Sequence, residues 1–251
     1  SSDLRSKRRP LPANCMLQFD SFDGAILVDK PTGCTSHDVV DRVRRKFGIK
    51  KVGHCGTLDP NATGLLILVL GRGTKLSEKL MSDDKVYEGD IKFGEATDSY
   101  DADGEVTATA PVPPLTLEQL NEAAATFLGD LQQVPPMVSA KKQGGVALYK
   151  LARKGIEVPR EPRLVHIYNF RCTAYTEPVG KFRVACTKGT YVRSLAHDLG
   201  AKLGCGAHLA TLRRVTSGKW DVADAIPLDA LLALPLGELE KRVIPFLQLA
   251  R

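Results

Sequence analysis

The residues best suited to chemistry lie in the segment Gly53–Gly64, whose sequence is GHCGTLDPNATG. Its glycines and its proline allow backbone turns that other residues disfavour, so this loop can approach a ligand closely. The apolar run Leu65–Leu70 follows at once and predicts a buried strand. Asp59 therefore sits on a turn anchored to the core, where a carboxylate can act as a nucleophile or a base. An aspartate before a proline is also typical of an ordinary turn, so spacing alone leaves both roles open.

Two further side chains have patterns that suit a site. Residues 85–93 alternate as a strand, which places Tyr87 on the same face as Phe93. That position fits a core tyrosine as well as a tyrosine in the wall of a pocket. Arg193 falls in the first turn of a helix that we expect to begin near Thr190, where the helix dipole disfavours a cation. An arginine there indicates an anionic partner or is simply a surface residue.

Hydrophobic periodicity predicts the elements that must position these residues. In chain order they are a strand at 24–28, a helix over 36–47, a strand at 65–70, a helix over 74–81, a strand at 85–93, a helix opening at 116–119, strands at 163–174 and 182–186, a helix over 190–203 and two short helices over 228–234 and 236–247. Thr35 or Ser36 caps the first helix and Gly48 ends it. Thr116 and Gln119 have the spacing of a capping box.

The composition fits a folded protein with a polyanionic partner. The chain has 251 residues, 43% of them hydrophobic, which is enough for a large core. A total of 35 Lys and Arg against 29 Asp and Glu gives a net charge of +6, although many ordinary enzymes share such a charge. The six cysteines include no C-x-x-C pair, so we expect reduced thiols rather than a zinc site or disulfides. No apolar run reaches the ~18 residues that a membrane span requires.

Three segments invite more than one interpretation. The basic arm, 1–23, is a solvated tail or a phosphate-contacting arm, and no signal-peptide apolar region follows it. The segment 131–160 holds Lys141 and Lys142 among irregular prolines and glycines, so we expect a mobile loop. The acidic segment 98–105 has Ser99 where a calcium loop needs a carboxylate, so we predict no calcium there.

The motif 53–64, continued by Gly71-Arg72-Gly73-Thr74-Lys75, resembles the signature of the TruB family of tRNA pseudouridine synthases. Further segments agree with the family in the same order, namely 29–36 (DKPTGCTS), 84–87 (DKVY), 97–104 (TDSYDADG), 186–195 (CTKGTYVRSL), 203–208 (LGCGAH) and 212–214 (LRR). The resemblance covers residues 24–220, which is most of the chain.

This resemblance implies an α+β pseudouridine synthase fold, with helices flanking a mixed, largely antiparallel central sheet. It also implies isomerisation of uridine 55 in the T-loop of tRNA to pseudouridine, after the base is flipped out of the RNA. The reaction breaks the N1–C1′ bond and rejoins the base through C5, so it needs no cofactor and no metal. We accordingly expect tRNA as the partner, no membrane association, a cytoplasmic location and a monomer.

The resemblance also assigns roles to the candidate catalytic residues. Asp59 is the expected nucleophile, and Arg193 pairs with it and keeps it ionised. Tyr87 is expected to stack on the target base and to accept a proton at C5. His54 is expected to fill the gap that the flipped uridine leaves. Leu212 is expected to form an apolar wall of the base pocket.

Five further residues are expected to contact or support the substrate. They are Lys30 and Pro31 in a turn under the site, Tyr191 beside the arginine, and Lys141 and Lys142 on RNA phosphates. The catalytic domain would then span 24–251, with 131–160 as an RNA-binding insertion. The family's C-terminal PUA domain is expected to be absent.

Two other interpretations fit the same residues. The chain could be a tRNA-binding folding factor without catalysis, or a subunit of a guide-RNA-dependent pseudouridine synthase. Intact Asp59, Tyr87 and Arg193 favour an enzyme. The bacterial-like segment 132–155 favours an enzyme that works alone.

Overall fold

The computed structural model describes residues 22–136, 142–143, 146–147 and 159–250. The strands are β1 (Gly24–Lys30), β2 (Val52–Cys55), β3 (Thr63–Leu70), β4 (Lys85–Phe93), β5 (Glu95–Thr97), β6 (Val106–Thr109), β7 (Gly129–Gln133), β8 (Lys142–Gln143), β9 (Val146–Ala147), β10 (Arg163–Thr176), β11 (Val179–Cys186), β12 (Ala207–Ser217), β13 (Trp220–Asp221), β14 (Ile226–Pro227) and β15 (Ile244–Pro245). The helices are α1 (Ser36–Phe47), α2 (Ser77–Met81), α3 (Leu117–Ala125), α5 (Val192–Lys202), α6 (Leu228–Ala233), α7 (Leu236–Glu240) and α8 (Phe246–Ala250), with 3-10 turns η2 (Gly71–Leu76) and η3 (Val222–Asp224).

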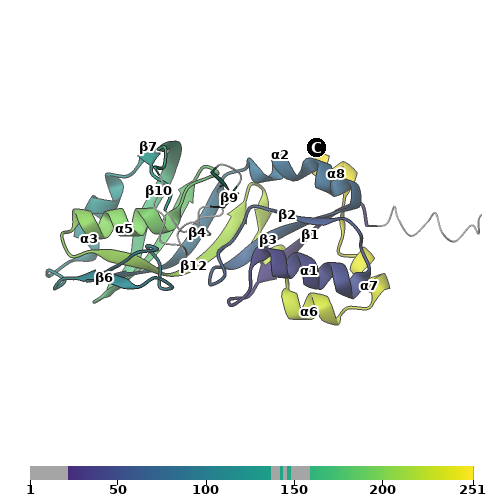
Figure 1. The fold of residues 1–251 in the computed structure, drawn as a ribbon, viewed down its shortest axis with the longest axis horizontal. Helices are drawn as coiled ribbons and strands as arrows, with labels where there is room; N and C mark the ends of the chain where they lie inside the picture. The colour runs from purple at the N-terminus through teal and green to yellow at the C-terminus, as the bar shows by residue number, and fades with distance from the viewer. Residues whose placement is uncertain (1–21, 137–141, 144–145, 148–158, 251) are drawn as a thin grey trace, which may run out of the picture.

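One mixed sheet runs along the length of the molecule and carries helices at both of its ends (Figure 1). In the described residues its main path has the strand order β14-β1-β3-β12-β4-β11-β10-β7. Most neighbouring strands are antiparallel, and the parallel pairs on this path are β1 with β14 and β3 with β12. This arrangement is the α+β class that the sequence predicts.

The half of the sheet around β1 and β3 is covered on both faces. Helices α1, α6 and α7 contribute to the hydrophobic cluster on one face, and α2 and α8 contribute to the cluster on the other (Figure 1). Because helices shield both faces of this half from water, β3 is apolar at nearly every position, as the run after the Asp59 loop predicts. Thr35 caps α1 through a capping box with Asp38, and Gly48 ends it in the left-handed conformation, so the predicted helix boundaries are confirmed.

The other half has its own core on one face of the sheet. Helices α3 and α5 pack on β4, β10, β11 and β12 through a cluster that includes Leu120, Phe170, Leu195 and Leu199. The strands predicted at 163–174 and 182–186 are longer than expected and pair as one antiparallel hairpin. The capping box predicted at Thr116 opens α3.

The two halves join where β12 lies between β3 and β4. Strand β12 pairs with β4 along most of its length but with β3 over only two positions, Arg213 with Thr63 and Arg214 with Gly64. Tyr87 and Leu212 are half-buried at this junction and pack against the hydrophobic cores of both halves. The sheet therefore brings residues from both halves to one place.

Candidate active site at the junction of the two halves

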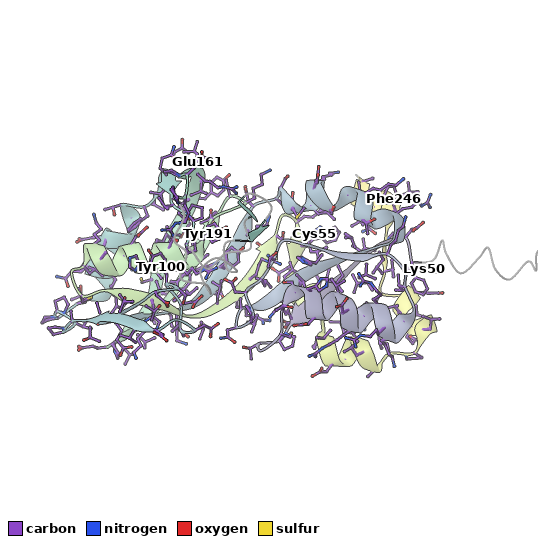
Figure 2. All side chains as sticks on the ribbon, in the orientation of Figure 1. Lys50, Cys55, Tyr100, Glu161, Tyr191 and Phe246 are labelled. Carbon is purple, nitrogen blue, oxygen red and sulfur yellow. The ribbon has the colours of Figure 1, made fainter. Side chains whose placement is uncertain are left out.

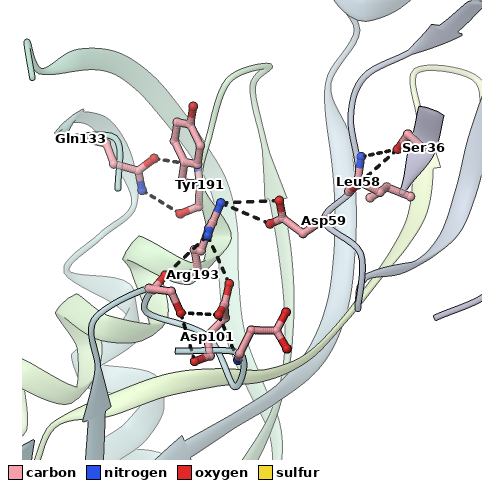
Figure 3. A network of polar contacts seen from close by, with 9 residues as sticks. Ser36, Leu58, Asp59, Asp101, Gln133, Tyr191 and Arg193 are labelled. Atoms are coloured by element: carbon pink, nitrogen blue, oxygen red, sulfur yellow. Dashed lines mark hydrogen bonds and ion pairs between the residues drawn. The ribbon is translucent and has the colours of Figure 1, made fainter. Parts of the chain in front are cut away.

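The loop that carries Asp59 connects β2 to β3 and is fixed from the side by α1. The first residue of that helix, Ser36, is buried, and its hydroxyl accepts a hydrogen bond from the Leu58 N–H at 2.9 Å and donates one to the Leu58 carbonyl at 3.2 Å (Figure 3). A tight turn follows, because the Ala62 N–H donates to the Asp59 carbonyl at 3.1 Å. Asp59 thus sits between two anchored points.

Lys30 holds the same loop from below. Its side chain is fully buried, and its ammonium donates to the carbonyls of Pro31 at 2.9 Å, Pro60 at 3.0 Å and Ala62 at 2.7 Å. Burial lowers the pKa of Lys30, and the nearby Cys34 and Asp59 oppose that change. A fully buried ammonium with three carbonyl partners supports the loop and does not reach the surface.

Arg193 is shared between two carboxylates. The side chain is buried at the start of α5, and one terminal nitrogen lies 3.4 Å and 3.5 Å from the two carboxylate oxygens of Asp59. The other terminal nitrogen lies 3.1 Å from Asp101 and 3.5 Å from the Ser99 carbonyl (Figure 3). The ion pair expected between Arg193 and Asp59 is present, and Asp101 is a second, closer partner.

The electrostatics of Asp59 are set by these neighbours. Loss of hydration raises the pKa of Asp59, Arg193 lowers it, and the carboxylates of Asp101 and Asp103 raise it further. About half of the side chain, 46%, remains exposed, so the carboxylate is open from one side. It is held in orientation by the guanidinium and still accessible to a reactant.

Asp59 opens into a pocket of about 660 Å³. The predicted residues that line it are Asp59, Tyr87, Tyr191, Arg193 and Leu212. Four more basic side chains line it, namely Lys85, Arg163, Lys188 and Arg214. In the all-atom view, Cys55, next to the Asp59 loop, and Tyr191 both lie near the middle of the molecule, where the two halves meet (Figure 2). The pocket is therefore basic, partly aromatic and large enough for a nucleoside.

Tyr87 and Arg214 form one wall of this pocket from neighbouring strands β4 and β12. Burial raises the pKa of Tyr87, and the positive charge of Arg214 opposes that rise. The phenol is therefore protonated at neutral pH. Arg214 is almost fully buried and donates to the carbonyls of Leu65 at 2.7 Å and Gly56 at 3.1 Å. It thus holds the first part of the Asp59 loop against the sheet.

Comparison with known proteins identifies the family. Residues 44–192 match the model of the N-terminal domain of TruB family pseudouridylate synthases, and residues 193–246 match the model of the tRNA pseudouridylate synthase B C-terminal domain. This chain belongs to the TruB family. The resemblance read from the motifs is confirmed.

Curated relatives of this TruB family member align with it over most of its length. A protein named tRNA pseudouridine synthase B from Opitutus terrae is 59% identical over 229 residues, which are 91% of this chain and 95% of the relative. A protein of the same name from Dechloromonas aromatica is 49% identical over 227 residues, which are 90% of this chain and 76% of that relative.

A solved structure supports the fold. A chain in the crystal structure of a Cbf5-Nop10-Gar1 complex is 26% identical and superposes with a TM-score of 0.72. The match covers 96% of this chain and 64% of the solved one, so this chain spans less than two thirds of that structure. The expected pseudouridine synthase fold is confirmed.

The other residues predicted for this TruB family site do not line the pocket or lie outside the described residues. Pro31 contributes its carbonyl to Lys30 beneath the loop. His54 lies on β2, half-buried, and is not among the described residues that line the pocket. Burial lowers the pKa of His54. Lys141 lies outside the described residues, and Lys142 is in β8.

Sequence reasoning missed three residues that organise the site. Asp101 and Arg214 both fall within motifs that matched the family, but nothing in their spacing shows that one meets Arg193 and the other meets the Asp59 loop. The third is Gln133 at the end of β7, whose side-chain amide makes two hydrogen bonds with the Tyr191 backbone, at 2.7 Å and 3.0 Å (Figure 3). Gln133 fixes the start of α5 and hence the backbone that leads to Arg193.

Within the ranges given above, no group of three or more His, Cys, Asp and Glu side chains is arranged to hold a metal ion. In the same ranges, no helix combines the length and the apolar character that crossing a bilayer requires.

Proposed function

We propose that this chain converts uridine 55 in the T-loop of tRNA to pseudouridine, working in the cytoplasm as a monomer and without a cofactor. Membership of the TruB family and the name shared by its relatives support a tRNA pseudouridine synthase. The observation that carries the proposal is that Asp59, Tyr87 and Arg193 come from separate elements and line one basic pocket.

In the proposed reaction, Asp59 acts as the nucleophile while the N1–C1′ bond of the uridine breaks. The carboxylate must be ionised, and Arg193 at 3.4 Å favours that form against the effect of burial. The detached base turns within the pocket, and C5 bonds to C1′ as the carboxylate of Asp59 is released. The proton of C5 then leaves, and N1 gains a proton, so the product is an isomer of the substrate.

The pocket walls supply positioning for the turning base. Tyr87 would stack on one face of the uracil, and Leu212 would give an apolar surface on which the ring can rotate. The raised pKa of Tyr87 disfavours a standing phenolate. Tyr87 would therefore act as a proton relay, whose oxygen accepts the C5 proton while its own hydroxyl proton passes to solvent, late in the reaction.

RNA recognition in this proposal combines shape and charge. Extruding the uridine costs a few kcal/mol of stacking, which contacts to the flipped base and to phosphates must offset. Exposed Arg163 and Lys188 at the pocket rim are placed for phosphates of the T-arm. We propose the same for Lys141 and Lys142, and that His54 stacks where the uridine was. Lys30 and Pro31 would act by supporting the Asp59 loop.

The proposal is tested by tritium release from tRNA labelled at C5 of uridine. The wild-type chain should release tritium from one uridine per tRNA, and Asp59→Asn should release none while its melting temperature and its tRNA affinity are retained. Glu238→Gln, which removes another paired carboxylate on α7, is the control and should be fully active. Wild-type tRNA binding without any release would instead indicate a folding factor.

A second assay separates the stand-alone enzyme from a guide-dependent subunit. A solved chain that resembles this one belongs to a Cbf5-Nop10-Gar1 complex, so partner proteins are included in the assay. The purified chain is given a T-arm hairpin with no other RNA or protein. Turnover on this hairpin supports the stand-alone enzyme. Turnover only after addition of a guide RNA and partner proteins would overturn it.

A further inference from the structure

Tyr100, the residue just before Asp101, has an unusual backbone conformation. Its φ is +65°, and within the described ranges it is the one residue other than glycine with a positive φ. The left-handed region is strained for an L-residue because its Cβ approaches the next carbonyl, and a bulky side chain adopts it rarely. Such a conformation persists where surrounding contacts enforce it, and these residues cluster at functional sites.

A stacking contact with α5 is one of those enforcing contacts. The rings of Tyr100 and His197 lie 3.9 Å apart between centroids and only 20° from parallel. His197 lies four residues after Arg193, so both side chains project from the same face of α5. Arg193 therefore holds Asp101, and one turn later His197 holds the adjacent Tyr100. Consecutive residues of the loop dock on consecutive turns of the helix.

Strand β12 holds the same loop from the other side. The Leu209 N–H donates to the Tyr100 carbonyl at 3.0 Å, and the Ala102 N–H donates to the Leu209 carbonyl at 3.0 Å. These bonds flank Asp101 and pair its backbone with Leu209 of β12. The buried Nδ1 of His197 has no hydrogen-bond partner among the described residues, so the contact that His197 makes here is through the face of its ring.

We propose that Tyr100 and His197 are positioning residues, which place Asp101 and through it the guanidinium of Arg193 beside Asp59. The contact of Arg193 with Asp101, at 3.1 Å, is closer than its contact with Asp59, at 3.4 Å, so the position of Asp101 governs where the guanidinium lies. Neither ring is among the described residues that line the pocket, so the pair acts on turnover and not on RNA binding. This inference rests on the proposed function.

The test compares variants that keep or remove the stack. Asparagine tolerates the left-handed conformation, so Tyr100→Asn removes the ring without adding strain. Tyr100→Asn and His197→Ala should each lower kcat for tritium release about tenfold, with KM changed less than about twofold. His197→Phe keeps a flat ring and should restore kcat to within about threefold of wild type. The double variant Tyr100→Asn/His197→Ala should be no worse than either single variant, because both remove one contact.

A control and a second measurement separate positioning from general stability. Tyr175→Leu removes an edge-on contact with Phe93 outside the pocket, and it should lower the melting temperature without changing kcat. Amide hydrogen exchange at Ala102 and Leu209 should become faster in Tyr100→Asn and stay slow in His197→Phe. This exchange does not depend on activity, so it tests the inference even if the wild-type chain releases no tritium.

Three results would overturn the inference. They are an unchanged kcat in Tyr100→Asn, a His197→Phe variant as impaired as His197→Ala, and unchanged exchange at Ala102 and Leu209 when the Tyr100 ring is removed.

Discussion

A single buried guanidinium orders the charges of the pocket at the residue scale. Arg193 divides its two terminal nitrogens between Asp59, which is open to the pocket, and Asp101, which is largely enclosed. A buried cation with only one carboxylate would follow that carboxylate wherever it moved. With a second partner on a fixed loop, Arg193 becomes a stationary reference for Asp59.

The first prediction concerns that second partner. Asp101→Asn leaves the size of the side chain but removes its charge, so Arg193 loses its closer anionic contact. We expect kcat to fall by about 10- to 100-fold with KM changed less than about threefold. Steady-state tritium release at several tRNA concentrations measures both constants. A loss that appears mainly in KM would mean that Asp101 contacts RNA instead.

The second prediction concerns pH. Asp59 must be ionised to react, so activity falls as pH drops through its pKa, and that pKa lies above the ordinary value of about 3.9 because of burial. Arg193→Met removes the cation that opposes the rise. The acid limb of kcat/KM should therefore move to higher pH in Arg193→Met, and turnover should fall far more than tRNA affinity. A limb that moves to lower pH would contradict the pairing.

Residues of the site differ in how far the sequence could predict them. Asp59, Tyr87 and Arg193 stand in motifs whose residue types suit the chemistry, and all three line the pocket. Asp101 lies in an acidic segment that matches a family motif, but the motif predicts no role for it. Asp101 contacts Arg193, which lies 92 positions later, only because the fold brings the two together. Local residue spacing cannot predict such a contact.

The start of α1 shows, at the element scale, two adjacent side chains with different tasks. Thr35 caps the helix by accepting a hydrogen bond from the Asp38 N–H at 3.0 Å. Ser36 turns the other way and bonds both the N–H and the carbonyl of Leu58, next to Asp59. One hydroxyl stabilises the element, and the other transmits its position to the site.

The third prediction uses this difference. Ser36→Ala leaves the buried backbone groups of Leu58 unpaired, which costs about 1–3 kcal/mol, and it frees the Asp59 loop, so kcat should fall by about tenfold. Thr35→Ala is the matched control, because it should cost about 1 kcal/mol of stability with kcat unchanged. Thermal denaturation and tritium release on both variants make the comparison. If Ser36→Ala and Thr35→Ala had equal kcat values, the role of Ser36 would be purely structural.

Elements failed to match the sequence prediction where tertiary contacts override periodicity. Residues 71–76 form a 3-10 turn instead of the first part of the helix predicted over 74–81. A Cβ added at Gly73 would lie 2.0 Å from the Gly24 carbonyl oxygen, so this turn presses directly on β1. The helix predicted over 236–247 ends at Glu240, because Ile244 and Pro245 pair with β1. A strand partner that far away in sequence leaves no periodic signal.

The whole molecule presents a basic pocket between two cores, and the fourth prediction follows from its charge. Arg163→Ala and Lys188→Ala should each weaken tRNA binding and reduce the magnitude of the slope of log K against log salt by about 1. Lys241→Ala, on the far end beside α7, is the control and should leave the slope unchanged. Filter binding between 50 and 200 mM salt, roughly the range over which phosphate contacts weaken, measures it. A slope that is unchanged in both rim variants would place the RNA backbone elsewhere.

At the scale of the whole molecule, the family motifs predicted the fold but did not predict the junction of the two halves. Motif order indicated the α+β pseudouridine synthase fold, because each motif has a fixed place in that fold. The two-position parallel contact between β3 and β12 is too short to leave a pattern in either strand. Tyr87 and Leu212 looked like core and wall residues, and they prove to touch both cores at once.

That short parallel contact makes the enzyme sensitive to small separations. A Cβ added at Gly64 would lie 2.3 Å from the Arg214 carbonyl oxygen, so the seam tolerates no side chain at this position. Asp59 belongs to one side of the seam, while Tyr87 and Arg193 belong to the other. Warming that widens this contact, with the helices and strands of both halves still intact, would part the reactive carboxylate from its counter-ion. Catalytic activity would thus be lost at a temperature below that at which the protein unfolds.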